Sequence, residues 1–174
     1  MQKLWDMAGV DGLEAAQSLF GEEVIYLSRF QSVETVLAGK ECSVLRLCDR
    51  NFRIRYSGPL DQLITDQLIT DQLITPLQHC IWIKQYSWLG TLTFPIEQLP
   101  AFIENATTRA PHRLTDLPNN QALPARFKDI PLLAWRHNIQ GNPAVELHAA
   151  QTDLDRLSEQ LKALRLVCMN SFTC

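Results

Sequence analysis

The sequence is poor in the residues and motifs that accompany common enzyme chemistry. Its 174 residues include only seven glycines, which leaves little material for a phosphate-cradling loop. HExxH, GxSxG, GxGxxG and P-loop patterns are all absent. We therefore expect no catalytic residue, no bound cofactor and no metal centre.

The chain also lacks a long hydrophobic run and a CxxC motif. No apolar run approaches the ~18 residues of a membrane span, and Asp6, Gly9 and Asp11 interrupt the start of the chain, unlike the core of a signal peptide. An odd number of cysteines argues against a disulfide framework or a structural zinc site. The cysteines are Cys42, Cys48, Cys80, Cys168 and Cys174. We expect free thiols and a cytoplasmic location.

The overall composition is that of a soluble globular protein. Apolar residues make up 46% of the chain and charged residues 20%. The length suits a single domain that buries roughly 70% of the surface of its unfolded chain. A net charge of −3 and an isoelectric point of about 5.8 argue against nonspecific binding to nucleic acid or to anionic membranes.

One pentapeptide, DQLIT, occurs three times without substitution within residues 57–80. A period of five matches neither the helix nor the strand, and fifteen residues are too few for a solenoid that buries its own core. Removing two copies leaves a sensible connection between two strands. We interpret the repeat as a duplication that a loop tolerates, with an exposed apolar arm that binds a partner as the alternative.

The first half of the chain predicts one helix followed by strands. Asp11 as N-cap and Gly21 at the C-terminus delimit a helix, and residues 22–30 (EEVIYLSRF) are typical of a strand. Residues 32–57 predict a β-meander, although residues 32–39 fit a short helix as well. In its last strand the apolar side chains alternate with two arginines; they are Phe52, Ile54 and Tyr56 on one face and Arg53 and Arg55 on the other.

The second half predicts two β-β-α units. The first comprises two strands within residues 79–95, joined near residues 87–90, and a helix that follows Pro95. Residues 106–130 contain three prolines without periodicity and predict a long loop. The second unit comprises a hairpin that turns at residues 140–143 and a helix with a buried leucine stripe at Leu154, Leu157, Leu161 and Leu164. We therefore predict a single α+β domain over residues 1–174, with a mostly antiparallel sheet and helices on one face.

Few clusters of reactive side chains emerge from this arrangement. His79 and Cys80 are adjacent and point to opposite faces of a strand, and Cys42 and Cys48 lie roughly 20 Å apart along one strand. His137, Glu146 and His148 fall on neighbouring strands of the last hairpin, where a metal site is conceivable. An exposed polar face is the preferred interpretation.

Arg53 and Arg55 also suggest an alternative function. Arginines that alternate with aromatic residues are typical of stacking platforms on RNA-binding sheets. The segment lacks the glycine of the usual RNA-binding motif, so the aromatic residues are equally consistent with a core face. Nucleic-acid binding through these two arginines is kept as an alternative.

Charge is unevenly distributed along the chain. Residues 1–41 hold seven acidic and three basic residues, whereas residues 106–130 hold four basic and two acidic residues. Such asymmetry can steer a partner of complementary charge, and an exposed tryptophan near a turn can anchor one. The predicted partner-binding residues are Trp88, Arg109, His112, Arg113, Arg126 and Lys128.

These observations together favour a non-enzymatic, cytoplasmic protein-binding module. An immunity-type inhibitor or a secretion-chaperone-like adaptor fits the size and layout, and the expected partner is another protein rather than nucleic acid or a membrane. Two alternatives remain: a subunit of a larger protein or nucleoprotein assembly that contacts RNA or DNA, and a small cysteine- or histidine-dependent enzyme.

Overall fold

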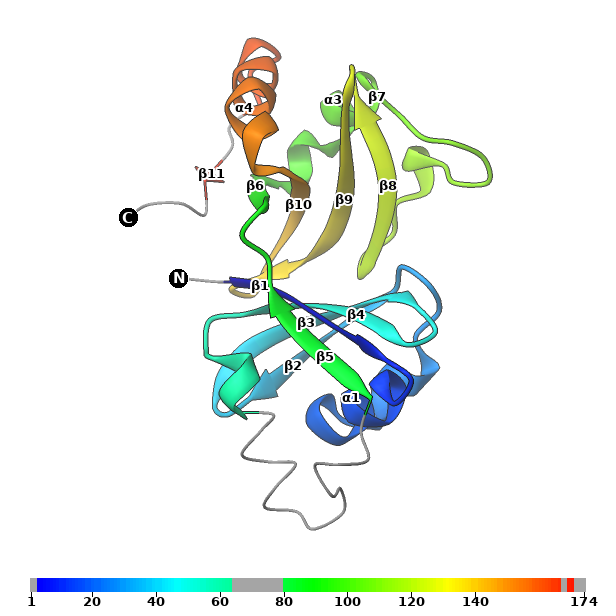
Figure 1. Ribbon diagram of the computed structural model, residues 1–174. Helices are drawn as coiled ribbons and strands as arrows, with labels where there is room; N and C mark the ends of the chain where they lie inside the picture. The colour runs from blue at the N-terminus through cyan, green and yellow to red at the C-terminus, as the bar shows by residue number, and fades with distance from the viewer. Residues whose placement is uncertain (1–2, 64–79, 167–168, 171–174) are drawn as a thin grey trace. The chain divides into compact units, whose positions relative to one another are not determined.

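Two antiparallel sheets with helices packed against them make up the described part of the chain (Figure 1). The computed structural model describes residues 3–63, 80–166 and 169–170. Contacts divide the chain into unit 1, residues 1–86, and unit 2, residues 87–174. The predicted α+β class with antiparallel strands is confirmed. The prediction of a single domain stays a prediction, and most of the pentapeptide segment lies outside the described residues.

Unit 1 holds a five-stranded sheet with the strand order β2-β3-β4-β1-β5. Helix α1 (Gly12–Phe20) and a 3₁₀ helix (Glu22–Tyr26) lie between its first two strands along the chain and pack against it. The strands are β1 (Lys3–Gly9), β2 (Ser32–Leu37), β3 (Lys40–Cys48), β4 (Asn51–Tyr56) and β5 (Ile81–Gln85). The predicted meander over residues 32–57 therefore corresponds to β2, β3 and β4, and residues 32–37 form a strand rather than a helix.

The alternation in β4 decides which face of the unit 1 sheet carries the core. Phe52, Ile54 and Tyr56 are buried and pack with apolar residues of α1 and β1. Strand β1, which we did not predict, supplies Trp5 and Met7 to the same core. Because side chains alternate along a strand, the residues between these apolar positions lie on the opposite face.

Helix α1 was predicted with correct boundaries, but its cap differs. The Asp11 carboxylate does not cap the helix; its Oδ2 accepts a hydrogen bond from the backbone N–H of Cys80 at 2.8 Å. The strand predicted over residues 22–30 is wrong. After Gly21, which has φ = 96°, the chain forms the 3₁₀ helix that buries Val24 and leaves Tyr26 exposed. Packing of this short connection outweighs the strand propensity of its β-branched and aromatic residues.

Unit 2 holds a six-stranded sheet with the order β11-β6-β10-β9-β8-β7. Its helices are α3 (Leu99–Ile103) and α4 (Leu154–Ala163), with 3₁₀ turns at Ile96–Gln98, Leu114–Asp116 and Gln151–Asp153. The strands are β6 (Leu89–Pro95), β7 (Ala106–Thr107), β8 (Gln121–Phe127), β9 (Ile130–Ile139), β10 (Asn142–Ala150) and β11 (Met169–Asn170). None of the helices within the described residues is long and apolar enough to cross a membrane.

The hairpin of β9 and β10 and helix α4 follow the prediction closely. The hairpin turns at Gln140 and Gly141, both with positive φ (52° and 77°), as a tight two-residue turn requires. The leucine stripe of α4 faces the core, with Leu154, Leu157 and Leu161 buried. Three aromatic rings fill the same core: Phe94 and Phe127 flank Phe102 with centroid distances of 5.4 and 5.5 Å.

The two strands predicted within residues 79–95 are present but do not form a hairpin. Strand β5 pairs with β1 in unit 1, whereas β6 pairs with β10 in unit 2. The intervening segment at Tyr86 and Ser87 is the boundary between the units. Local pattern predicted both strands, but it carries no information about which distant strand each one joins.

Residues 106–130 were predicted as a loop, and this is wrong at the N-terminal end, where residues 106–107 form β7, and for the C-terminal part. Residues 121–127 form β8, which pairs with β9 along its whole length. Arg126 lies opposite Pro131, and Pro124 lies opposite Leu133. Proline lacks the N–H that a hydrogen-bonded pair requires. These two pairs therefore fit the non-hydrogen-bonded positions of the β8–β9 ladder, at which the backbone N–H and C=O groups point away from the partner strand. Consistently, the carbonyl of Arg126 faces Thr107 of β7.

Strand β7 covers only the end of β8, because its two residues pair with Arg126 and Phe127. The outer edge of β8 before Arg126 has no strand partner among the described residues. Pro124 stands at this edge, where a proline costs no ladder hydrogen bond. The chain between β7 and β8 leaves the sheet there, and this departure creates the site described below.

Candidate functional site

The arginines that suggested a nucleic-acid platform are largely buried. Arg53 donates hydrogen bonds to the Asp6 carboxylate, with an Nε–Oδ1 distance of 2.9 Å, and its guanidinium lies over the ring of Tyr86. The Tyr86 hydroxyl donates to Asp6 at 2.6 Å, and partial burial together with this bond raises the pKa of Tyr86. Arg55 is 8% exposed. The expectation of a solvent-exposed arginine face is therefore wrong.

The polar face of the last hairpin is also buried. His137, Glu146 and His148 are at most 2% exposed, which corrects the expectation of an exposed polar face. His148 Nε2 and Glu146 Oε1 are joined by a 2.7 Å hydrogen bond, and the ring of Trp135 stacks on His137 at 4.0 Å. In the described part of the chain, no group of three His, Cys, Asp or Glu side chains has a metal-binding arrangement.

The three described cysteines are free thiols in different environments. Cys42 is buried, and burial together with the nearby Glu34 carboxylate raises its pKa to about 12. Cys48 and Cys80 are exposed. A thiol with so high a pKa is a poor nucleophile at neutral pH, so Cys42 is a packing residue.

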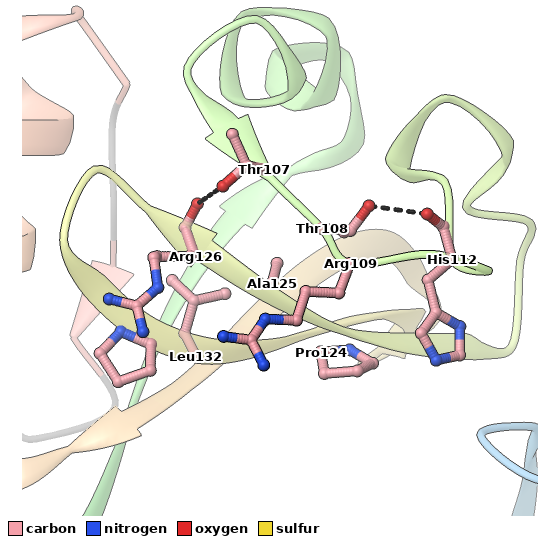
Figure 2. Close-up of a pocket in the computed structure, with 9 residues that line it drawn as sticks. Thr107, Thr108, Arg109, His112, Pro124, Ala125, Arg126 and Leu132 are labelled. Carbon is pink, nitrogen blue, oxygen red and sulfur yellow. Dashed lines mark hydrogen bonds between the residues drawn. The ribbon is translucent and has the colours of Figure 1, made fainter.

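An open pocket in unit 2 is a candidate site. It has a volume of about 370 Å³ and lies where the chain departs from the outer edge of β8 (Figure 2). A volume of this order is typical of sites for small organic ligands. Its lining comes from β7 and the following loop, from β8 and from the start of β9, and comprises Thr107, Thr108, Arg109, His112, Pro124, Ala125, Arg126, Pro131 and Leu132.

Hydrogen bonds within the loop order the backbone that carries two of the basic residues. The Thr108 hydroxyl donates to the carbonyl of His112 at 2.8 Å, and the His112 N–H donates to the carbonyl of Arg109 at 3.0 Å. These two bonds close a tight turn next to the edge of β8. Arg109 and His112 are thus presented by an ordered turn.

The third basic side chain comes from the strand itself. Arg126 Nη1 donates to the carbonyl of Asp129 at 3.0 Å, which ties the guanidinium to the turn between β8 and β9. Figure 2 shows Arg109 and Arg126 extending toward the same part of the pocket, with His112 at its other end in this view. Between them lie Pro124, Ala125 and Leu132, which form an apolar floor. The arrangement suits a small ligand with an anionic group.

The structure brings together three of the six predicted partner-binding residues and separates the others. Arg109, His112 and Arg126 line the pocket, whereas Arg113 and Lys128 are exposed and do not line it. Trp88 is 55% exposed, as expected for a residue near a turn, and its carbonyl accepts a hydrogen bond from Gln151. Partner binding by these six residues stays a prediction.

Sequence reasoning missed the apolar floor and the threonines of the pocket. Pro124 and Arg126 are two residues apart and share a face of β8, but that signal requires recognising β8 as a strand. Leu132 and Pro131 belong to the neighbouring strand and reach the pocket only through the pairing of β8 with β9. Their contribution is not visible in the local sequence.

Comparison with known proteins shows similarity in structure alone. No protein-family model and no curated protein sequence matches the chain. The glycine cleavage system aminomethyltransferase T from Bartonella henselae superposes with a TM-score of 0.68 at 13% identity, over 92% of this chain and 43% of that protein. A chain of the heterotetrameric sarcosine oxidase from Corynebacterium sp. U-96, in complex with pyrrole 2-carboxylate, superposes with a TM-score of 0.63 at 14% identity. That match covers 94% of this chain and 78% of the oxidase chain.

These similarities show a shared fold and correct the predicted function. The fold found across nearly the whole of this chain is that of components of two enzymes. The prediction of a non-enzymatic protein-binding module, as an inhibitor or an adaptor, is therefore wrong. The chain spans less than half the length of the aminomethyltransferase.

Proposed function

We propose that this chain is the ligand-binding component of an enzyme, and that the pocket beside β8 holds a small carboxylate ligand. The observation that carries the proposal is that Arg109 and Arg126 both line one pocket of about 370 Å³ with an apolar floor. Guanidinium groups match carboxylate geometry and form charge-assisted hydrogen bonds with it.

The shared fold supports an enzymatic context. Glycine cleavage and sarcosine oxidation, which the two similar proteins' names describe, both act on small molecules that carry a carboxylate. The pocket supplies binding and orientation, and the residues that line it include no activated nucleophile.

Titration of the full chain with pyrrole 2-carboxylate tests this proposal. We expect saturable binding by calorimetry or by chemical-shift changes at the pocket. Arg109→Gln and Arg126→Gln should each weaken binding by about 1.5–3 kcal/mol, the contribution of a hydrogen bond to a charged group.

The matched controls are Arg113→Gln and Lys128→Gln. Each removes one positive charge from the same region without touching the pocket lining. They should leave affinity nearly unchanged, because exposed charges outside the site contribute only screened, long-range attraction. Equal losses in the pocket and control variants would contradict the proposal, as would the absence of saturable binding.

A further inference from the structure

The pocket lining contains basic residues and no acidic residue. Arg109, Arg126 and His112 line it, and no carboxylate is among its nine lining residues. The acidic side chain of the adjoining turn, Asp129, is bonded to Arg156, with an Nη1–Oδ2 distance of 2.6 Å. Arg126 bonds the carbonyl of Asp129 rather than its carboxylate. The pocket therefore offers the guanidinium groups of Arg109 and Arg126 and holds no acid in its lining, while the Asp129 carboxylate outside the lining attracts Arg126 as well as Arg156.

The absence of an acidic residue from the lining distinguishes carboxylates that carry an ammonium group from those that do not. An α-amino acid is a zwitterion, and its ammonium group lies close to the carboxylate that the arginines would hold. The ammonium would then face the guanidinium groups at short range without a carboxylate to receive it, and like charges at such distances repel even in water. A carboxylate without an ammonium group gains the same attraction and avoids this repulsion.

The apolar floor also favours a carboxylate without an ammonium group. Pro124, Ala125 and Leu132 offer methylene and methyl groups to the body of the ligand. An uncharged ligand body covers this floor at a much smaller desolvation cost than an ammonium, which would lose its hydration there. The charge of the lining and its apolar floor therefore both favour a carboxylate whose body is uncharged.

We propose that the pocket is specific for carboxylates of net negative charge and discriminates against zwitterionic amino acids. This inference rests on the proposed function, since it names the ligand class of the same site. The acceptable ligand carries a carboxylate for Arg109 and Arg126 and an uncharged body for the floor. Glycine and sarcosine as free amino acids are then poor ligands of this chain.

Two pairs of isosteric ligands test the inference on the full chain by titration calorimetry at neutral pH. Methoxyacetate differs from sarcosine, and glycolate from glycine, chiefly by an oxygen in place of the charged nitrogen. We expect the oxygen member of each pair to bind at least about tenfold more tightly, as a close like-charge contact implies. Equal affinity within both pairs would overturn the inference while leaving carboxylate binding, and hence the proposed function, intact.

A charge variant gives the second arm of the test. Thr107 lines the pocket from β7, and Thr107→Glu places a carboxylate where an ammonium could use it. This variant should narrow or reverse the preference between methoxyacetate and sarcosine, whereas the neutral isostere Thr107→Gln should preserve it. Thermal unfolding confirms that both variants are folded. If the preference is the same in both variants, the inference fails; if none of the carboxylates binds the wild-type chain, the proposed function fails with it.

Discussion

Single residues in this protein show how the same side-chain type takes opposite roles in two places. Arg53 is directed to a buried carboxylate on the neighbouring strand, and Arg109 is presented to an open pocket by a tight turn. Both were identified from the sequence as exposed basic residues. Whether a guanidinium is buried in an ion pair or accessible to a ligand depends on which residues pack over its position.

The pair of Arg53 and Asp6 gives a prediction about stability. Both side chains are largely buried, at 11% and 2% exposure, so removing one leaves an uncompensated charge. We expect Arg53→Ala to lower the free energy of unfolding by about 3–5 kcal/mol. Denaturant unfolding followed by circular dichroism measures the change.

Lys84 provides the matched control. It lies opposite Asp6 on β5 but is exposed, so Lys84→Ala should change the free energy of unfolding by less than about 0.5 kcal/mol. Equal effects of the two substitutions would show that the buried ion pair does not contribute as the structure indicates.

At the scale of secondary-structure elements, the edge of the unit 2 sheet explains how a strand can contain a proline and where the pocket lies. Strand β8 contains a proline, which argues against a strand when only the sequence is considered. The pairing places Pro124 where its missing N–H faces an edge without a strand partner in the described part of the chain. The same edge of β8 therefore explains both the proline in the strand and the position of the pocket. This edge tolerates Pro124, and the loop with Arg109 and His112 lies next to it.

The pairing of β1 with β5 leads to a prediction for glycine. Gly9 has φ = 143°, and a Cβ there would meet the carbonyl oxygen of Cys80 at 1.9 Å, a contact with backbone that cannot relax cheaply. Gly39 also has positive φ (73°), but nothing lies within 4 Å of its Cβ position. Gly39→Ala should cost about 1–2 kcal/mol of folding free energy, the price of left-handed backbone alone.

Gly9→Ala should cost about 1–3 kcal/mol more than Gly39→Ala, because it adds a steric conflict to the backbone cost. Melting temperatures of the two variants, measured side by side, rank the effects. If Gly39→Ala proved the more destabilising variant, the close approach of β1 and β5 at Gly9 would be refuted.

For the whole molecule, the main feature is that each sheet is assembled from one continuous part of the chain. Strands β1–β5 all precede Ser87, and β6–β11 all follow Tyr86. Each unit also has its own cluster of buried apolar residues. The pocket draws its lining from residues 107–132 alone, so it belongs entirely to unit 2.

A fragment comprising residues 87–174 should therefore fold without the rest of the chain. It retains the complete six-stranded sheet and the core around Phe102. We expect a cooperative thermal transition, dispersed amide resonances, and affinity for pyrrole 2-carboxylate within a few fold of the full chain. A fragment without a cooperative transition would show that unit 2 depends on unit 1 for stability.

The sequence by itself determined the elements with strong periodicity and punctuation. Helix α1 between Asp11 and Gly21, the alternation of β4, the hairpin turn at Gln140 and the leucine stripe of α4 all follow from local spacing and backbone preference. The α+β class follows from their order. In the candidate site, the sequence identified Arg109, His112 and Arg126 as members of a basic segment.

The tertiary structure decided what lies against each face and edge. It assigned β5 and β6 to different sheets, turned residues 22–26 into a 3₁₀ helix, and buried Arg55 and His148. It also gathered three separated basic residues over an apolar floor. The physical reason is that side-chain period fixes which residues share a face, whereas burial and binding depend on contacts between segments far apart in the chain.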